Sequence, residues 1–270
     1  MLHRIVAQKQ QEVALLKERL TVRDMEQHIA ALPPCISMKE RFRNRTRPVG
    51  VIAEVKKASP SKGVIREYFD PVDIASRYSD ANVEAISVLT DQTFFQGDVS
   101  YLAAIKHNLT KPIPLLRKDF NIDPLQIYEA RANGADAVLL IAAILDKQRM
   151  SELAREAGNV GLEILVEVHT ERELDGVLSS IEPDLLGINN RDLKTFTTSL
   201  SNTFRLITKI PSSIIRISES GIRTKEDIAL LHQSNVDGVL VGETFMRQAD
   251  VTGAVFNLVG PAPVQKDVLV

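Results

Sequence analysis

The sequence predicts a single closed barrel of eight parallel strands that alternate with helices, a (β/α)8 TIM barrel. Short apolar runs recur about every 27 residues from residue 49 onward, a spacing that fits one strand, one helix and two loops. No G-x-G-x-x-G motif follows the first run, which disfavours the alternative of an open, doubly wound sheet. The predicted strands are 51–55, 85–89, 113–116, 137–141, 162–168, 185–188, 214–217 and 238–241.

Composition is typical of a globular protein and argues against several classes of function. The 270 residues are 44% hydrophobic and 25% charged, so the chain can bury a sizeable core. A net charge of -2 argues against nucleic acid as a partner. No stretch is apolar enough for a membrane span or a secretory signal. The single cysteine, Cys35, excludes an internal disulfide, so we expect a cytoplasmic protein with no membrane partner.

Residues 1–48 are predicted to form a helical extension that caps the barrel, and residues 49–270 the barrel domain. Apolar residues recur at helical spacing up to Leu20. Thr21 is a capping residue for a second helix, which Pro33 and Pro34 end. A basic run at 39–47 then precedes the first strand. We interpret this run as a solvated face, with attraction of an anionic substrate to a nearby mouth as the alternative.

Helices are predicted in most gaps between the strands. Two of them carry proline in the first turn, where its missing N–H is tolerated. Gly134 and Gly158 are expected to end two helices, and Thr170 and Thr224 to cap two others. The predicted segments are 71–80, 124–133, 146–157, 170–178 and 224–233.

Polar residues follow six of the eight strands, at the carboxyl ends where parallel barrels carry their reactive groups. Alternation places Glu54 and Lys56 on the same face of the first strand. Two charges on a largely buried strand are costly unless they are paired or functional. Any one strand end, taken alone, is equally compatible with a solvated edge, but their convergence on one rim predicts an active site. The other residues at these ends are Lys118, Phe120, Glu167, Asn189, Arg191, Glu219 and Glu243.

Two glycine-containing turns predict a phosphate site. Ser220 and Gly221 precede the helix expected at Thr224, and Gly242 precedes Thr244. Loops that end in helix N-termini offer unpaired backbone N–H groups to an anion, and glycine permits close approach. Each turn alone is compatible with an ordinary loop, and the pair together favours phosphate binding.

The sequence shows no metal-binding constellation. The five histidines are scattered, and His169 is interpreted as a hydrogen-bonding residue at a strand end. Asp91, Asp98 and Asp119 are too dispersed in the sequence to assign to a cation. Neither a Ser-His-Asp set nor a nucleophilic cysteine is evident. Acid–base chemistry by lysine and glutamate on a phosphorylated small molecule therefore remains, with a Schiff base at Lys118 as an alternative.

Six blocks of the sequence, in order, resemble the indole-3-glycerol phosphate synthase family. The resemblance covers nearly the whole chain, including the helical extension, and six blocks in order are highly specific. The resemblance is to the form of this family that has a single barrel. The blocks are IAEVKKASPS at 52–61, LRKDF at 116–120, LVEVH at 165–169, GINNRDL at 187–193, SESGI at 218–222 and LVGE at 240–243.

The resemblance implies conversion of 1-(2-carboxyphenylamino)-1-deoxyribulose 5-phosphate to indole-3-glycerol phosphate, carbon dioxide and water, a carbon–carbon lyase step of tryptophan synthesis. It implies no metal or organic cofactor and a monomer. Other phosphosugar barrels, isomerases or aldolases, stay open as alternatives, as does a phospholigand-binding barrel without turnover. The catalytic set argues against a barrel without turnover.

The resemblance also assigns roles to residues of this chain. Lys118 is implied as the general acid at the carbonyl and Glu167 as a general acid/base. Glu54 and Lys56 position these groups, Lys56 can share acid duty in dehydration, and which lysine acts at which step stays open. Asn189 is implied to hold substrate hydroxyls or the carboxylate. The remaining implied residues are Ser220 as a further catalytic residue at the phosphate cradle, and Ser59, Phe120, Arg191, Glu219, Gly221, Gly242 and Glu243 for substrate binding.

Overall fold

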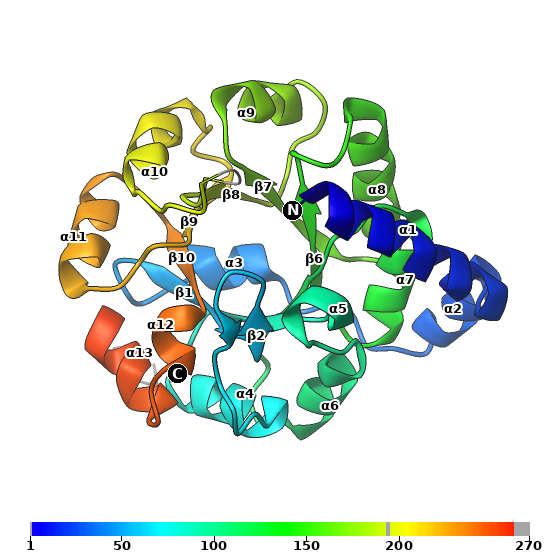
Figure 1. The fold of residues 1–270 in the computed structure, drawn as a ribbon, viewed down its shortest axis with the longest axis horizontal. Coiled ribbons are helices and arrows are strands. Elements are labelled where there is room, and N and C mark those ends of the chain that lie inside the picture. Colours follow the sequence, from blue (N-terminus) through cyan, green and yellow to red (C-terminus); the bar gives the residue numbers. More distant parts are fainter. Residues whose placement is uncertain (1, 193–194, 262–270) are drawn as a thin grey trace, which may run out of the picture.

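The computed structural model describes residues 2–192 and 195–261, and in this part of the chain eight parallel strands close into a barrel ringed by helices (Figure 1). Neighbouring strands follow the order β1-β10-β9-β8-β7-β6-β5-β4, and β4 pairs with β1. The predicted (β/α)8 fold is confirmed. The barrel strands are β1 (Gly50–Val55), β4 (Ala85–Leu89), β5 (Leu115–Lys118), β6 (Ala137–Ile141), β7 (Glu163–Val168), β8 (Leu185–Asn189), β9 (Ile215–Glu219) and β10 (Gly238–Val241).

Helices cover the outside of the barrel, and shorter elements lie in the loops (Figure 1). A small antiparallel hairpin, β2 (Ala58–Ser59) and β3 (Gly63–Val64), follows β1. The extension forms α1 (Leu2–Arg19), α2 (Val22–Ile29) and α3 (Met38–Arg43). The later helices are α4 (Pro71–Asp80), α5 (Gln92–Phe95), α6 (Ser100–Asn108), α7 (Pro124–Ala132), α8 (Lys147–Asn159), α9 (Glu171–Leu178), α10 (Ser201–Leu206), η1 (Ile207–Lys209), α11 (Lys225–Gln233), α12 (Glu243–Met246) and α13 (Val251–Val259).

Two predicted boundaries were wrong for identifiable reasons. The third barrel strand begins at Leu115 rather than at 113, because Pro112 and Pro114 flank Ile113 and lack the N–H that a strand ladder uses. Helix α8 runs through Gly158 to Asn159, and the left-handed glycine beyond its end is Gly161. Helices α3, α5, α6, α10, α12 and α13 were not predicted. Of these, α6 and α10 have no side-chain cap, whereas Asp91 caps α5 and Asp250 caps α13.

Alternation along the strands separates two cores. In β1, Val51, Ala53 and Val55 pack outward in the large cluster between barrel and helices. Ile52 faces inward, where it belongs to a second cluster with side chains of the other strands and of α3. The inward face of the same strand then carries Glu54, so the lower barrel is apolar and its upper rim is charged.

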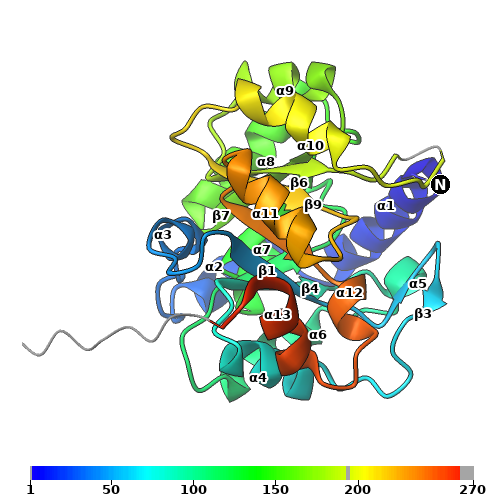
Figure 2. The same cartoon turned by 90° about the vertical axis from the view of Figure 1, so that its left-hand side faces the viewer.

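The extension contacts both ends of the barrel. Figure 2 shows α3 on the left of the barrel and α1 on the right. Phe42 of α3 is fully buried, and its ring lies where side chains at Gly50 and Gly238 would otherwise project. Because these glycines begin the paired strands β1 and β10, α3 closes the amino end of the barrel.

The basic run at 39–47 lies largely at this closed end, which corrects its interpretation. Arg41 and Arg43 are exposed as expected, but Arg47 is only 3% exposed. Its guanidinium donates to the carbonyl oxygens of Asn82 at 2.7 Å and Gly260 at 3.2 Å. Attraction of a substrate to the mouth is wrong for this run, because α3 and the mouth are at opposite ends.

Residues 1, 193–194 and 262–270, parts of the predicted extension, fourth block and barrel domain, lie outside the described residues. Among the described residues, no helix combines the length and apolar character needed to cross a membrane.

Candidate active site

A cavity of about 510 Å³ opens at the carboxyl ends of the barrel strands. Strand β1 brings Glu54 and Lys56 to it, β5 brings Lys118, and β7 brings Glu167. Every site residue expected from the sequence lines this cavity. The remaining ones are Ser59, Phe120, Asn189, Arg191, Glu219, Ser220, Gly221, Gly242 and Glu243.

Lys118 and two glutamates form the buried charged centre of the cavity. Lys118 Nζ lies 3.0 Å from Glu167 Oε2 and 3.8 Å from Glu219 Oε2. Burial alone would lower the pKa of Lys118, but the surrounding carboxylates, Glu167 first, outweigh it and raise that pKa. Burial would raise the pKa of Glu167, yet Lys118 and His169 hold it down at about 2. Both partners are therefore charged at neutral pH.

Glu219 behaves differently from Glu167 although it faces the same lysine. Burial and the neighbouring Glu167 carboxylate raise the pKa of Glu219 to about 8. The shorter distance from Lys118 to Glu167 decides which carboxyl is ionised. Glu219 Oε1 is also buried without a hydrogen-bond partner among the described residues. At neutral pH Lys118 thus faces one carboxylate, Glu167, and one neutral carboxylic acid, Glu219.

Glu54 and Lys56 form an ion pair on the rim of β1, with both side chains largely buried. Gly242, the residue after β10, lies against this pair. A Cβ at Gly242 would overlap the Glu54 carboxylate and lie 2.9 Å from Lys56 Nζ. The absence of a side chain at Gly242 is therefore required by the Glu54–Lys56 pair.

Arg191 joins loops on opposite sides of the mouth. Its backbone N–H donates to Asn189 Oδ1 at 2.9 Å, which fixes the amide at the end of β8. Its guanidinium donates to Ser61 Oγ at 3.1 Å, in the loop that follows Ser59. The loops after β1 and β8 are thus bridged by a cationic group that lines the cavity.

The phosphate cradle in the structure differs in part from the one predicted from the sequence. Ser220 and Gly221 adopt consecutive left-handed conformations, with φ of 69° and 80°. The start of α11 is already satisfied by its own capping box, in which Thr224 and Asp227 bind each other's backbone N–H. Helix α11 therefore offers fewer unpaired N–H groups to an anion than expected.

Side chains near this cradle add positive charge that sequence reasoning missed. Arg223 and Arg247 both line the cavity. Arg247 donates to the Glu243 carboxylate at 2.9 and 3.0 Å, so the Glu243 side chain is neutralised. Thr244 Oγ1 donates to the Ile222 carbonyl oxygen at 2.8 Å and ties the two loops together.

His169 was expected to be a hydrogen-bonding residue at a strand end, and its backbone does this. Its N–H donates to Glu173 Oε2 at 2.6 Å, and its carbonyl accepts from Asn202 at 3.0 Å. The imidazole itself lines the cavity 3.5 Å from Glu167 Oε1. Burial opposes its protonation, but Glu173 and Glu167 together raise the pKa of His169.

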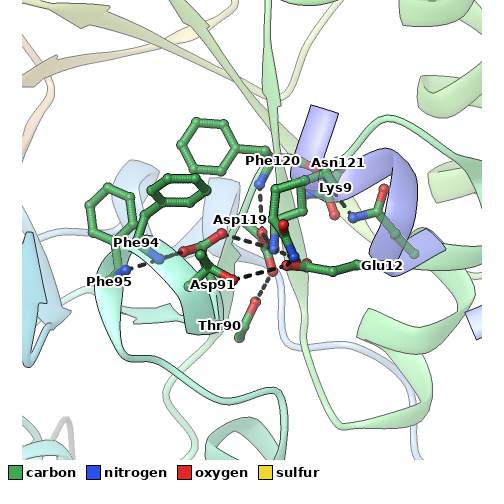
Figure 3. A network of polar contacts seen from close by, with 12 residues as sticks. Lys9, Glu12, Thr90, Asp91, Phe94, Phe95, Asp119, Phe120 and Asn121 are labelled. Atoms are coloured by element: carbon green, nitrogen blue, oxygen red, sulfur yellow. Dashed lines mark hydrogen bonds and ion pairs between the residues drawn. The ribbon is translucent and has the colours of Figure 1, made fainter. Parts of the chain in front are cut away.

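Two aspartates that are too dispersed in the sequence to assign to a metal cation nevertheless lie side by side in the structure. Asp91 and Asp119 meet on the ammonium of Lys9 from the extension (Figure 3), whereas Asp98 binds Gln92 and Ser100 elsewhere. No spacing rule in the sequence could pair them. In the described part of the chain, no group of three or more His, Cys, Asp or Glu side chains is arranged to hold a metal ion.

Comparison with known proteins gives a consistent result. A family model described as indole-3-glycerol phosphate synthase matches residues 2–258. A protein of that name from Shouchella clausii is 41% identical over 98% of this chain and 100% of its own length. Another from Geobacillus thermodenitrificans is 49% identical over 81% of this chain and 84% of its own length.

Among solved structures, a 3-hexulose-6-phosphate synthase from Salmonella typhimurium matches with a TM-score of 0.59 and 15% identity. The match covers 78% of this chain and 97% of that one. At this identity the likeness shows the fold alone.

Proposed function

The chain belongs to the indole-3-glycerol phosphate synthase family, and from this premise we propose how its residues carry the family's reaction. The chain is a carbon–carbon lyase of tryptophan synthesis. It converts 1-(2-carboxyphenylamino)-1-deoxyribulose 5-phosphate to indole-3-glycerol phosphate, carbon dioxide and water. The single observation that carries the assignment of roles is the buried Lys118–Glu167 pair at 3.0 Å inside the cavity.

Lys118 is the general acid of ring closure. An aromatic carbon of the substrate attacks the C2′ carbonyl, and negative charge develops on the carbonyl oxygen. The raised pKa of Lys118 keeps a proton on Nζ at neutral pH, so this proton is available to that oxygen. Loss of carbon dioxide then restores the electrons that the ring used to form the new bond.

Glu167 is the base of the later dehydration. Its pKa of about 2 keeps the carboxylate ionised, and it lies beside the group that Lys118 protonates. It can take the proton that leaves carbon as the hydroxyl departs as water. Lys56 shares acid duty at this hydroxyl, and the ion pair with Glu54 positions it. Ser220, at the rim of the cradle, completes the proposed catalytic set.

Substrate contacts divide between the two sides of the mouth. Arg191 and Asn189 face the substrate carboxylate and hydroxyls, and their mutual hydrogen bond supports this assignment. Ser59 and Phe120 line the wall, and Glu219 faces the substrate as a neutral acid.

The backbone at Gly221, Gly242 and Glu243 cradles the phosphate. Because Arg247 already engages the Glu243 carboxylate, Glu243 acts here through its N–H. The neighbouring Arg223 side chain favours an anion at the same place, whereas the charge of Arg247 is already paired with Glu243.

We extend the proposal to organisation and compartment. Residues 1–48 form the extension that caps the mouth through α1, since Leu2 and Ile5 line the cavity, and residues 49–270 form the catalytic barrel. A location in the cytoplasm is supported by the single, partly buried cysteine. Within residues 2–192 and 195–261, the large exposed apolar side chains lie on six separate segments, which supports a monomer.

The direct test is to add the substrate to the purified protein and follow indole absorbance together with carbon dioxide release. We expect both products in equal amounts without added cofactor. Borohydride added during turnover separates this chemistry from a Schiff-base aldolase. Covalent trapping of substrate on Lys118 would contradict the acid–base roles proposed here.

A further inference from the structure

One face of α1 carries two different functions along its length. Leu2, Ile5 and Lys9 are spaced three and four residues apart, so they lie on the same side of the helix. Leu2 and Ile5 line the catalytic cavity, and Ile5 is only 3% exposed. Lys9 lies one turn further along and is not among the lining residues. It is nevertheless 3% exposed, which is unusual for a lysine.

Lys9 is buried because carboxylates from two barrel loops converge on it (Figure 3). Its Nζ lies 2.8 Å from Asp119 Oδ1 and 3.0 Å from Asp91 Oδ2, and 2.7 Å from Glu12 Oε2 on its own helix. The contacts with Asp91 and Asp119 are ion pairs. Burial would lower the pKa of Lys9, but Asp119 and Asp91 outweigh it and raise that pKa. The ammonium is therefore charged at neutral pH.

The two aspartates also hold the aromatic wall of the cavity. Asp119 follows Lys118 directly, and its Oδ1 accepts the Phe120 N–H at 2.8 Å. Asp91 Oδ1 accepts the N–H groups of Phe94 at 2.7 Å and Phe95 at 3.1 Å, which caps α5. The rings of Phe95 and Phe120 lie 6.1 Å apart, and both line the cavity. One ammonium thus joins three segments of the mouth: α1, the loop before α5 and the loop after β5.

We propose that Lys9 is a positioning residue for the reaction, which sets α1 and the two aspartate loops so that the cavity wall is formed before substrate arrives. Lys9 does not touch substrate or the reacting groups. The inference rests on turnover of the proposed substrate but not on the division of roles between Lys118 and Lys56. Its consequence lies in binding, because Glu167 holds Lys118 independently of Lys9.

The test compares three variants made in the full chain. Lys9→Met keeps the apolar stem and removes the charge. Lys9→Met combined with Asp91→Asn also removes the carboxylate left without a cation, while the amide oxygen still caps α5. Lys17→Met is the matched control on the same helix, because Lys17 pairs with Asp123 at 2.6 Å but its side chain is 55% exposed.

We expect Lys9→Met to raise KM about tenfold with kcat changed less than about threefold, since small misplacements of binding groups have effects of this order or larger. The double variant should regain most of the lost unfolding temperature and keep the raised KM. Amides of residues 2–8 should exchange hydrogen faster in both variants, while those of the barrel strands stay protected. Lys17→Met should leave KM and this exchange unchanged.

A purely structural role predicts another pattern. If KM returns to normal together with the unfolding temperature in the double variant, or never rises in either Lys9 variant, the positioning role is wrong. If the unmodified protein makes no indole-3-glycerol phosphate, the proposed function fails whatever Lys9 does. Should Lys9→Met not fold, the double variant decides the question.

Discussion

Glu163 and Glu167 lie four residues apart on the same face of β7, yet they serve opposite ends of the barrel. Glu163 accepts hydrogen bonds from Ser37 Oγ at 2.5 Å and from the backbone N–H groups of Met38 at 2.7 Å and Lys39 at 2.9 Å. Glu167 faces Lys118 at 3.0 Å and the imidazole of His169 at 3.5 Å. The first carboxylate fastens α3 to the barrel, whereas the second is held among groups that can exchange protons.

The same contrast extends around the two rims. At the amino end, an acidic residue preceding one strand accepts the N–H of a neighbouring strand, so both polar groups are satisfied. At the carboxyl end, Glu219 Oε1 and both ring nitrogens of His169 have no hydrogen-bond partner among the described residues. These atoms line the cavity, so they can form hydrogen bonds with a substrate. The amino-end pairs are Val51 N to Glu84 (2.6 Å), Leu115 N to Asp136 (2.8 Å), Ile164 N to Asp184 (3.1 Å) and Arg216 N to Asp237 (3.0 Å).

The contrast is tested most strongly by replacing one lysine at each end. Lys118→Met removes the proposed acid, so kcat should fall about 10²–10⁴-fold, the usual contribution of general acid catalysis. Lys106→Met is the control, because Lys106 pairs with Asp136 at 2.6 Å at the amino end. It should lower stability and leave kcat unchanged. Steady-state kinetics and thermal unfolding of both variants measure this, and near-normal kcat in Lys118→Met would refute the acid role.

The two glutamates of β7 provide a second comparison. Glu167→Gln keeps size but cannot accept a proton, so dehydration should slow more than ring closure and decarboxylation. In single turnovers, carbon dioxide release should then precede indole absorbance, and a hydroxylated dihydroindole should accumulate. Glu163→Gln should leave the two signals together and cost about 1–3 kcal/mol of stability. If the signals of Glu167→Gln slow equally and stay together, the late base is another group.

Packing at the closed end should affect stability without affecting chemistry. Phe42→Ala removes the ring that fills the amino end between Gly50 and Gly238. We expect a loss of about 3–5 kcal/mol in the free energy of unfolding, as for other buried aromatics. Denaturant titration at 25 °C measures this loss, and kcat is determined well below the new transition. A loss of kcat in the folded variant would show that the two ends are coupled.

The smallest change in kcat at neutral pH is expected for Glu219→Gln, because the amide resembles the neutral carboxylic acid already present. Because the pKa of Glu219 is raised from 4.5 to about 8, its folded form keeps a proton that the unfolded chain releases. Its contribution to stability is therefore complete below pH 4.5 and is lost as pH rises toward 8, by at most about 1.4 kcal/mol per pH unit. The variant should lack this loss and be more stable than the unmodified protein at pH 9. Parallel unfolding curves of the two proteins across pH 5–9 would contradict the raised pKa.

The sequence alone determined that the fold is a barrel and which residues lie at the carboxyl ends of its strands. The strand period, the caps at Thr170 and Thr224 and the alternation at Glu54 and Lys56 are local signals, so they can be read without the fold. The predicted strand ends converge because parallel strands in a barrel share one direction. This placed Lys118 and Glu167 on the same rim although β5 and β7 are separated by β6.

Tertiary structure decided which charges meet and what each does. Lys9 and Asp119 lie at opposite ends of the first half of the chain, and no periodicity relates them. The different pKa values of Glu167 and Glu219 depend on which carboxyl lies closer to Lys118, a matter of less than 1 Å. The two ends of the extension, α1 at the mouth and α3 at the base, likewise follow from packing across the barrel. Periodicity reports the direction of a side chain from its own element, whereas ion pairs and burial depend on elements that only folding brings together.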